Sequence, residues 1–556
     1  MKFKLLGIVS IIILGAFFRF YKLDWASGLF THPDEYHIII SANQLSFPSQ
    51  MNPHFFSYGT VTIYLIYFTQ QILKYFSLAF NFFLMGRLYS ALFSTLTILF
   101  VYKICRFFMR VRFSLLASLL VAITPGLIQQ AHFATPESAL IFFLFGALYF
   151  ILKFLEQNRI KFLLFTSIFF GLAMGVKINS IVFLLPLTMA IAIKSCPGKL
   201  RLKISNLYVR GNLKAFLKFI TLSIASVALA LATFAIAAPF VFLDSIDFKS
   251  NLDYEGGLAI GKFSVFYTRQ FIDTTPIVFQ AEKILPYALG IFLLLFAIGG
   301  FMLIIIILIK RPKSVIFIVS LTFLSIFLTN AFLFAKWTRF VAPSFPFFAI
   351  FSAFLLDRFY SKSKFISSVF TVVLLTGTLF WTIAFFSIYL RQDVRITSSN
   401  WIEKNLPTNS TILLEGGNMV DIPLEGNFNK TSLDFYNIET DNQQRSEIIF
   451  GLNRADYFII QSRRVFMNHQ RLPQIFPKTA NFYAALFDGK LGFTKIKEFT
   501  SYPMIQLGPQ SGGFKLEFPD EKAEETWSVF DHPVIRVFKK MRQLSISDYE
   551  KILELE

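Results

Sequence analysis

The chain has 556 residues, of which 55% are hydrophobic and only 16% are charged, and its mean hydropathy is +0.58. A soluble protein of this length is not so apolar, and its repeated apolar runs of about 18 or more residues indicate a multi-pass membrane protein. The formal charge of +19 would suit nucleic-acid binding. The basic residues lie between the apolar runs, however, where they set membrane orientation, so we expect no nucleic-acid partner.

The apolar runs predict about eleven spans of a cell membrane. Lys2 and Lys4 precede the first run, which predicts a cytoplasmic N-terminus. No small-residue cleavage site follows that run, so we interpret it as a retained span. The most basic loop, residues 194–218, is also expected in the cytoplasm. The predicted spans are residues 5–20, 86–104, 114–129, 139–155, 162–175, 181–193, 219–238, 284–309, 315–334, 340–356 and 365–390.

The apolar run at residues 60–80 needs a separate argument. The span after it, 86–104, leads into a loop with Arg106, Arg110 and Arg112, so it must run inward and begin outside. Because the first span already ends outside, the run at 60–80 cannot cross once. We expect it to lie along the outer interface as an amphipathic segment. The alternative is an ordinary span with a different topology.

Residues 391–556 are polar and predict an extracytoplasmic α/β domain, so we expect a membrane domain at 1–390 and a soluble domain at 391–556. Short apolar runs at 411–414, 457–460 and 534–538 predict strands. A helix is predicted to begin near Ser399, with Ser399 as its cap and Glu403 in its first turn.

Acidic and histidine side chains cluster in the first outer loop, where the sequence reads Thr31-His32-Pro33-Asp34-Glu35-Tyr36-His37. A carboxylate at this place can take or orient the proton of an acceptor hydroxyl or amine. Asp34 and Glu35 are therefore catalytic candidates, and His37 is a candidate for substrate binding. The alternative is a short helix that begins here and whose first turn favours acidic residues through the helix dipole.

A second acidic position, Glu137, lies at the outer end of a predicted span, with His132 nearby. Ionisable groups at membrane depth are candidates for a functional site, so we expect both side chains to contact substrate. Asp34, Glu137 and His132 could together hold a divalent metal ion, although no ligand spacing demands one. The alternative for Glu137 is a simple interfacial carboxylate.

Several lone cations lie at outer span ends, against the general bias of basic residues toward the cytoplasm. Such a cation can extend toward lipid headgroups, but several that converge on one cavity would bind a phosphate. These cations are Arg87, Lys177, Arg269, Lys336 and Arg339.

Short motifs along the first 360 residues form a recognisable series. In chain order they are RFYKL (19–23), HPDEYH (32–37), NPHFFSY (52–58), GRLYSAL (86–92), AHFATPE (131–137), GLAMGVK (171–177) and RFVAP (339–343). The series resembles the protein O-mannosyltransferase and aminoarabinose-transferase group of polyprenyl-phosphate-sugar-dependent glycosyltransferases, which have the GT-C membrane fold. The Asp34-Glu35 pair is its most specific part. This chain departs from the pattern at Glu137, where relatives often have Asp, and at Tyr58-Gly59, where they often have Tyr-Pro.

The resemblance implies interfacial helices in the first outer loop and a sugar transfer outside the membrane. The donor would be a sugar on a polyprenyl phosphate from the outer leaflet, and the acceptor a protein, a glycan or a lipid. The acceptor would attack the anomeric carbon with inversion while Asp34 takes or orients its proton. The phosphate would be held by some of Arg87, Lys177, Arg269 and Arg339.

Two other functions compete with sugar transfer. A transporter or flippase for a lipid-linked sugar would place ionisable groups near the midplane and show inverted repeats, and the sequence shows neither. A non-catalytic scaffold would have no reason to cluster Asp34, Glu35 and the outer cations.

Overall fold

The structure is a computed structural model that describes residues 2–78, 80–195, 213–417, 421–508 and 513–553. Most of the basic loop expected in the cytoplasm, residues 196–212, lies outside the described residues. The chain divides into two compact units, each described here by itself. The membrane unit comprises Met1–Leu23, Asp34–Ile260 and Thr275–Thr382, and the C-terminal unit comprises Asp24–Pro33, Gly261–Thr274 and Ile383–Glu556. The expected soluble domain at 391–556 stays a prediction.

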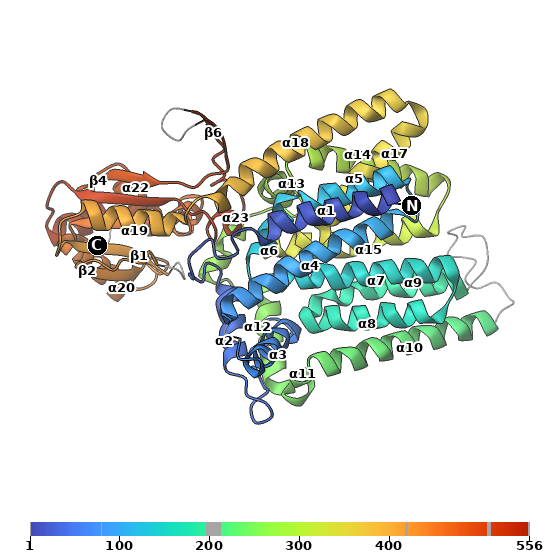
Figure 1. Cartoon of the computed structure of the whole chain (residues 1–556). Coiled ribbons are helices and arrows are strands. Elements are labelled where there is room, and N and C mark those ends of the chain that lie inside the picture. Colours follow the sequence, from blue (N-terminus) through green and yellow to red (C-terminus); the bar gives the residue numbers. More distant parts are fainter. Residues whose placement is uncertain (1, 79, 196–212, 418–420, 509–512, 554–556) are drawn as a thin grey trace. The chain divides into compact units, whose positions relative to one another are not determined.

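The membrane unit is a bundle of apolar helices (Figure 1). Eight described helical segments are long and apolar enough to cross a membrane, a bent pair adds a ninth, and two apolar helices are shorter. Each of the eleven predicted spans falls on one of these segments, so the helical multi-pass fold class is confirmed. The eight are α4 (Phe82–Cys105), α7 (Glu137–Gln157), η1 with α9 (Ile178–Ser195), α10 (Leu213–Ala237), α14 (Ile291–Lys310), α15 (Ser314–Ala331), α16 to α17 (Thr338–Lys362) and α18 (Lys364–Leu390). The bent pair is α5 (Val111–Ala122) with α6 (Pro125–His132), and the shorter helices are α1 (Lys2–Phe20) and α8 (Ile160–Val176).

Short helices occupy the segments between the spans. The predicted interfacial run forms α3 (Val61–Tyr75), which has 15 residues and is not among the helices that are long and apolar enough to cross. This length agrees with a segment that lies along the membrane, and its placement on the outer side stays a prediction. The other short helices of this unit are α2 (Pro33–Asn43), α11 (Phe240–Leu243), α12 (Ser245–Ile260), η4 (Gln280–Ile284) and α13 (Leu285–Leu289).

The bend between α5 and α6, 49°, leaves backbone carbonyls without helical donors. Pro125 begins α6 and cannot continue the hydrogen-bonding pattern of α5. The buried guanidinium of Arg19 donates to the carbonyls of Val121 at 2.9 Å and Ala122 at 2.8 Å. Unsatisfied backbone groups are costly inside a membrane, so Arg19 makes this break tolerable. The first cation of the RFYKL motif is thus a structural residue here.

The C-terminal unit is built around a five-stranded sheet, as the sequence predicts for an α/β domain. Its strand order is β2-β1-β3-β7-β4, in which β2, β1 and β3 are parallel and β7 is antiparallel to β3 and β4. A separate hairpin pairs β5 with β6. The strands are β1 (Thr411–Gly416), β2 (Asn429–Asp434), β3 (Tyr457–Ile460), β4 (Phe493–Phe499), β5 (Met504–Leu507), β6 (Phe514–Glu517) and β7 (Ile535–Lys540). The helices are η3 (Phe266–Phe271), α19 (Val394–Asn405), α20 (Asn442–Arg454), α21 (Phe466–Gln470), α22 (Pro477–Phe487), α23 (Glu525–Ser528) and α24 (Ile546–Ile552).

Alternating side chains place a hydrophobic core on each face of this sheet. Leu413 of β1 packs in one core with Leu452 of α20. Its neighbours Ile412 and Leu414 pack in the other core with Ile402 of α19. The three predicted strands correspond to β1, β3 and β7.

The predicted start of the helix near Ser399 is wrong. Helix α19 begins at Val394, and the Asp393 carboxylate, which accepts the backbone N–H of Arg395 at 2.7 Å, is its N-cap. Ser399 lies inside the helix, where its hydroxyl donates to the carbonyl of Pro423. Asp and Ser are both common N-caps. The Ser399 hydroxyl bonds the carbonyl of Pro423 instead, and Asp393 caps the helix.

A buried histidine in the C-terminal unit lies between two carboxylates. His532 contacts Asp520 through Nε2 at 2.8 Å and Asp531 through Nδ1, and all three side chains are buried. The Trp527 indole donates to Asp520, and the Tyr389 hydroxyl donates to Asp531. Burial lowers the pKa of His532, but the charges of Asp520 and Asp531 outweigh it and raise this pKa to about 10.

Replacing His532 with Gln should therefore have a pH-dependent effect on stability. Because the folded-state pKa exceeds the ordinary 6.5, the stabilisation by the charged imidazole is complete below about pH 6.5 and is lost as the pH rises toward 10. We expect the gap in unfolding temperature between the wild type and His532→Gln to narrow from pH 7 to about pH 10. Thermal unfolding of the full chain in detergent measures it, and a constant gap would contradict a charged His532.

Candidate active site

Asp34 lies in the first turn of α2, directly after Pro33, the first residue of the helix. Proline is favoured at this position and the helix dipole favours a carboxylate in the first turn. Only 8% of Asp34 is exposed, and its Oδ2 lies 2.9 Å from Nη1 of Arg339. Two of the predicted site residues, Asp34 and Arg339, are therefore joined, although they are 305 positions apart in the sequence.

Tyr58 connects this ion pair to a second one. Its side chain hydrogen-bonds Asp34, and Arg339 and Glu137 act on it electrostatically. Burial first, and then the negative charges of Asp34 and Glu137, raise the pKa of Tyr58 well above its ordinary value, against an opposing effect of Arg339. The hydroxyl therefore stays protonated at neutral pH and can donate a hydrogen bond.

The second ion pair joins Glu137 and Lys177. Glu137 is fully buried at the start of α7, and Nζ of Lys177 lies 2.9 Å from its Oε1. Lys177 follows the end of α8, and its ammonium lies 5.1 Å from the ring centre of Tyr58 and 4.9 Å from that of Phe340. Such cation–π contacts further stabilise the charge. Four predicted residues, Asp34, Glu137, Lys177 and Arg339, thus form one cluster around Tyr58.

Two buried polar atoms of this cluster have no hydrogen-bond partner among the described residues. They are Oε2 of Glu137 and Nε of Arg339. Buried polar groups are nearly always hydrogen-bonded, and an exception calls for an explanation such as a ligand or an ordered water. The cluster can therefore make more polar contacts than its own side chains supply.

A close backbone contact fixes the position of Tyr58. The N–H of Gly59 donates to the carbonyl of Val176 at 2.9 Å, and a Cβ on Gly59 would lie 1.9 Å from the carbonyl oxygen of Gly175. Only glycine permits this approach. Gly59, which stands where relatives often have Pro, therefore connects the loop of Tyr58 to the end of α8, directly before Lys177.

Glu35 faces a different partner from Asp34. Its carboxylate accepts two hydrogen bonds from Arg87, at 2.7 and 2.9 Å, and one from the backbone N–H of Ala134 at 3.0 Å. Arg87 also donates to the carbonyl of Leu23 at 2.6 Å and lies 3.9 Å from the ring centre of Phe83. Both charged side chains are fully buried. We interpret this bidentate pair as a brace between α2 and α4.

Two further predicted site residues of the membrane unit, His132 and His37, contact other groups. His132 is buried, with its ring nitrogens 2.9 Å from the carbonyl oxygen of Ile128 and 3.2 Å from that of Tyr21. His37 is exposed and stacks on Phe55, with ring centres 5.6 Å apart.

Arg269 belongs to the C-terminal unit. Its guanidinium donates to the carbonyl of Tyr436 and lies 2.8 Å from Nε2 of His469. It also lies 4.8 Å from the ring centre of Phe476. These contacts give Arg269 a place in the packing of that unit.

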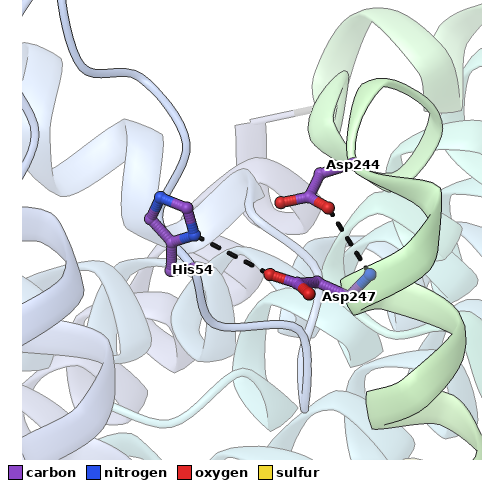
Figure 2. Close-up of side chains that lie close together, drawn as sticks. All are labelled: His54, Asp244 and Asp247. Atoms are coloured by element: carbon purple, nitrogen blue, oxygen red, sulfur yellow. Dashed lines mark hydrogen bonds and ion pairs between the residues drawn. The ribbon is translucent and has the colours of Figure 1, made fainter.

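Asp34, Glu137 and His132 do not form a metal-binding group within the described part of the chain. Figure 2 shows the group whose ligand atoms do lie close together, His54, Asp244 and Asp247. Asp244 accepts the backbone N–H of Asp247 at 3.4 Å, and Asp247 lies in the first turn of α12. His54 and Asp247 are more than half exposed. The start of a helix is sufficient to explain both carboxylates.

Comparisons with known proteins agree with this architecture. Residues 60–224 match the model of the dolichyl-phosphate-mannose-protein mannosyltransferase family. The structure is similar to the archaeal oligosaccharyltransferase AglB from Archaeoglobus fulgidus in complex with an inhibitory peptide and a dolichol-phosphate. That similarity has a TM-score of 0.55 and 12% identity, over 93% of this chain and 74% of AglB. This chain has the GT-C fold.

A second similar structure is ArnT from Cupriavidus metallidurans bound to undecaprenyl phosphate. Its TM-score is 0.47 at 13% identity, over 85% of this chain and 95% of ArnT. No curated protein sequence matches this chain. The resemblance to the GT-C glycosyltransferases, which the motifs suggest, is confirmed.

Sequence reasoning missed Tyr58 as a member of this cluster. It also missed the two aromatic side chains that flank the cations, Phe340 beside Lys177 and Trp337, whose ring centre lies 4.8 Å from the guanidinium carbon of Arg339. A signal for these residues was available. Tyr58 ends the NPHFFSY motif, and Trp337 and Phe340 are close neighbours of Arg339 in the sequence.

Replacing Gly59 with Ala tests the close contact that positions Tyr58. The added methyl group would meet the backbone of Gly175, so the loop or α8 must move. We expect a loss of about 1–3 kcal/mol in the free energy of unfolding, typical of overpacking. Gly256→Ala in α12 is the matched control, since nothing lies within 4 Å of its added Cβ. Denaturation midpoints in detergent measure both, and equal midpoints would contradict the contact.

Proposed function

We propose that this chain is a glycosyltransferase that moves a sugar from a polyprenyl-phosphate donor to an acceptor on the extracytoplasmic side of the membrane. The GT-C fold supports this class of activity. The observation that carries the proposal is the cluster of Asp34, Glu137, Lys177 and Arg339 around Tyr58. It holds two carboxylates and two cations at or beside the ends of helices in the membrane unit, where charged groups are retained mainly for function.

In the proposed reaction, a hydroxyl oxygen of the acceptor attacks the anomeric carbon of the donor. The bond between that carbon and the phosphate oxygen breaks, and the polyprenyl phosphate leaves with the electron pair. The hydroxyl proton passes to the Asp34 carboxylate, and the configuration at the anomeric carbon inverts. For an amine acceptor, the proton comes from the nitrogen.

Lys177 and Arg339 are the proposed phosphate-binding residues. Arg339 carries a buried Nε without a hydrogen-bond partner among the described residues, and Lys177 is held within 3 Å of Glu137. The guanidinium of Arg87, by contrast, already donates hydrogen bonds to Glu35 and to the backbone carbonyl of Leu23. Cations near the leaving group stabilise the charge that develops on the phosphate.

The ion pair between Asp34 and Arg339 suggests how donor binding prepares the base. A phosphate that takes over the Arg339 guanidinium would compete with Asp34 for the same donor. The carboxylate would then lose its strongest partner and become more basic. Tyr58 would keep it oriented through its hydrogen bond.

Replacing Asp34 with Asn removes the proposed base and keeps the size of the side chain. We expect the turnover rate to fall by about 10²–10⁴, the usual contribution of a general base. The measurement is transfer of radiolabel from a panel of polyprenyl-phosphate sugars by the purified protein. The control is the same change at an exposed residue of α12, Asp253→Asn, which should leave the rate unchanged.

Near-normal turnover of Asp34→Asn would remove Asp34 from the role of base. A different result would overturn the whole proposal. If the wild type consumes no donor of a broad panel but moves the lipid-linked sugar between the leaflets of vesicles, the chain is a transporter.

Replacing Arg339 with Gln should mainly weaken donor binding. A hydrogen bond to a charged group contributes about 1.5–3 kcal/mol, so we expect the KM for the donor to rise by about 10- to 100-fold. Arg311→Gln, at the end of α14, is the control. An unchanged KM with a lower kcat would show that Arg339 acts on the reaction step and not on donor binding.

A further inference from the structure

The hairpin of β5 and β6 has one apolar face and one polar face. Residues directly opposite each other in an antiparallel pair share a face, and alternate residues of a strand point to opposite faces. The register pairs Ile505 with Leu516 and Leu507 with Phe514. These four apolar side chains therefore lie on one face.

The other face of the hairpin carries the polar side chains. Gln506 pairs with Lys515, and Met504 pairs with Glu517 at the base. Lys515 and Glu517 form an ion pair at 2.7 Å. The alternation is that of a sheet with one face in an apolar environment and the other in water.

The apolar face is exposed in the structure. Leu507 is 64% exposed, Phe514 is 62% exposed and Leu516 is 39% exposed. A two-stranded hairpin has little stability of its own in water. An apolar face on so small an element indicates contact with something outside the described chain.

The base of the hairpin is attached to the end of α18, which belongs to the same unit. The N–H of Met504 donates to the hydroxyl of Ser387 at 3.1 Å, and Arg391 donates to the carbonyl of Ser501 at 3.0 Å. Helix α18 is one of the eight candidate spans and ends at Leu390. The hairpin therefore starts beside the C-terminal end of the last candidate span, and β6 is drawn near that end of α18 (Figure 1).

The exposed apolar surface of α18 continues to this attachment point. Ile383 is 48% exposed and Leu390 is 49% exposed. Ile505, the first residue of the apolar face, is one residue beyond Met504, about 3 Å along an extended strand. The interfacial layer on each side of a bilayer is about 5–7 Å thick, so the apolar face begins within the depth of that layer.

We propose that the hairpin of β5 and β6 is a membrane-binding element whose apolar face lies in the lipid interface next to the end of α18. The polar face, with Gln506 and Lys515, points to water. The hairpin would give the C-terminal unit a second attachment to the bilayer in addition to α18 itself. This inference is independent of the proposed sugar transfer.

Nitroxide labels on neighbouring positions test the two faces. The protein, with both native cysteines replaced by Ala, is labelled at Phe514→Cys or at Lys515→Cys and reconstituted in lipid nanodiscs. Lipid exposure favours collision with oxygen over collision with a water-soluble nickel complex. We expect the ratio of the two accessibilities to be several-fold higher at position 514 than at 515. Leu507→Cys and Gln506→Cys form a second pair with the same expectation.

Two outcomes would overturn the proposal. Equal access of the nickel complex at 514 and 515 would show that the hairpin lies in water. Protection of position 514 from both reagents would show that protein covers the apolar face. All labelled positions except the partly buried Gln506 are exposed, so the labels should not prevent folding, and circular dichroism of each labelled protein, compared with the wild type, checks this.

Discussion

The candidate site depends on one constraint: buried charged side chains at the ends of helices must be neutralised by partners. Asp34 is neutralised by Arg339, Glu137 by Lys177, and Tyr58 joins the two pairs. The loop and helix ends that supply these residues are therefore held together by electrostatics as well as by packing. Breaking one pair leaves a buried charge without its partner, which costs several kcal/mol. This dependence explains why residues from five separate segments meet at one place.

Two other buried arginines, Arg19 and Arg87, have partners within the protein that explain their burial without a ligand. Arg19 donates to the carbonyls that the bend between α5 and α6 exposes, and Arg87 binds both oxygens of Glu35. In the Glu35–Arg87 pair the contacts match the geometry of both groups. The cluster at Arg339 differs, because a donor of Arg339 is left over. A buried ion pair whose polar groups are all hydrogen-bonded can be explained by structure alone, whereas one with an unpaired polar group is a candidate for ligand binding.

Hydropathy and loop charge were sufficient to predict the spans, since both follow from the physics of the bilayer. The same reasoning selected Asp34, Glu137, Lys177 and Arg339, which the structure brings together. It could not predict which cation pairs with which carboxylate, because that depends on contacts between distant segments. For the same reason it missed Tyr58, did not pair Arg87 with Glu35, and began α19 too late at Ser399. The segments 24–33 and 261–274, which pack in the C-terminal unit, carry no local signal of that membership.

The adjacent acids Asp34 and Glu35 illustrate how a helix separates two roles. Consecutive residues of an α-helix point about 100° apart, so the two carboxylates of α2 face different neighbours. Glu35 accepts three hydrogen bonds from Arg87 and Ala134, which fix its position. In the proposed reaction, an incoming phosphate competes for the cation that pairs with Asp34, and Tyr58 orients the carboxylate. The proposed assignment of the base to Asp34 therefore rests on which of its partners can be exchanged, and this cannot be read from two adjacent acidic residues in the sequence.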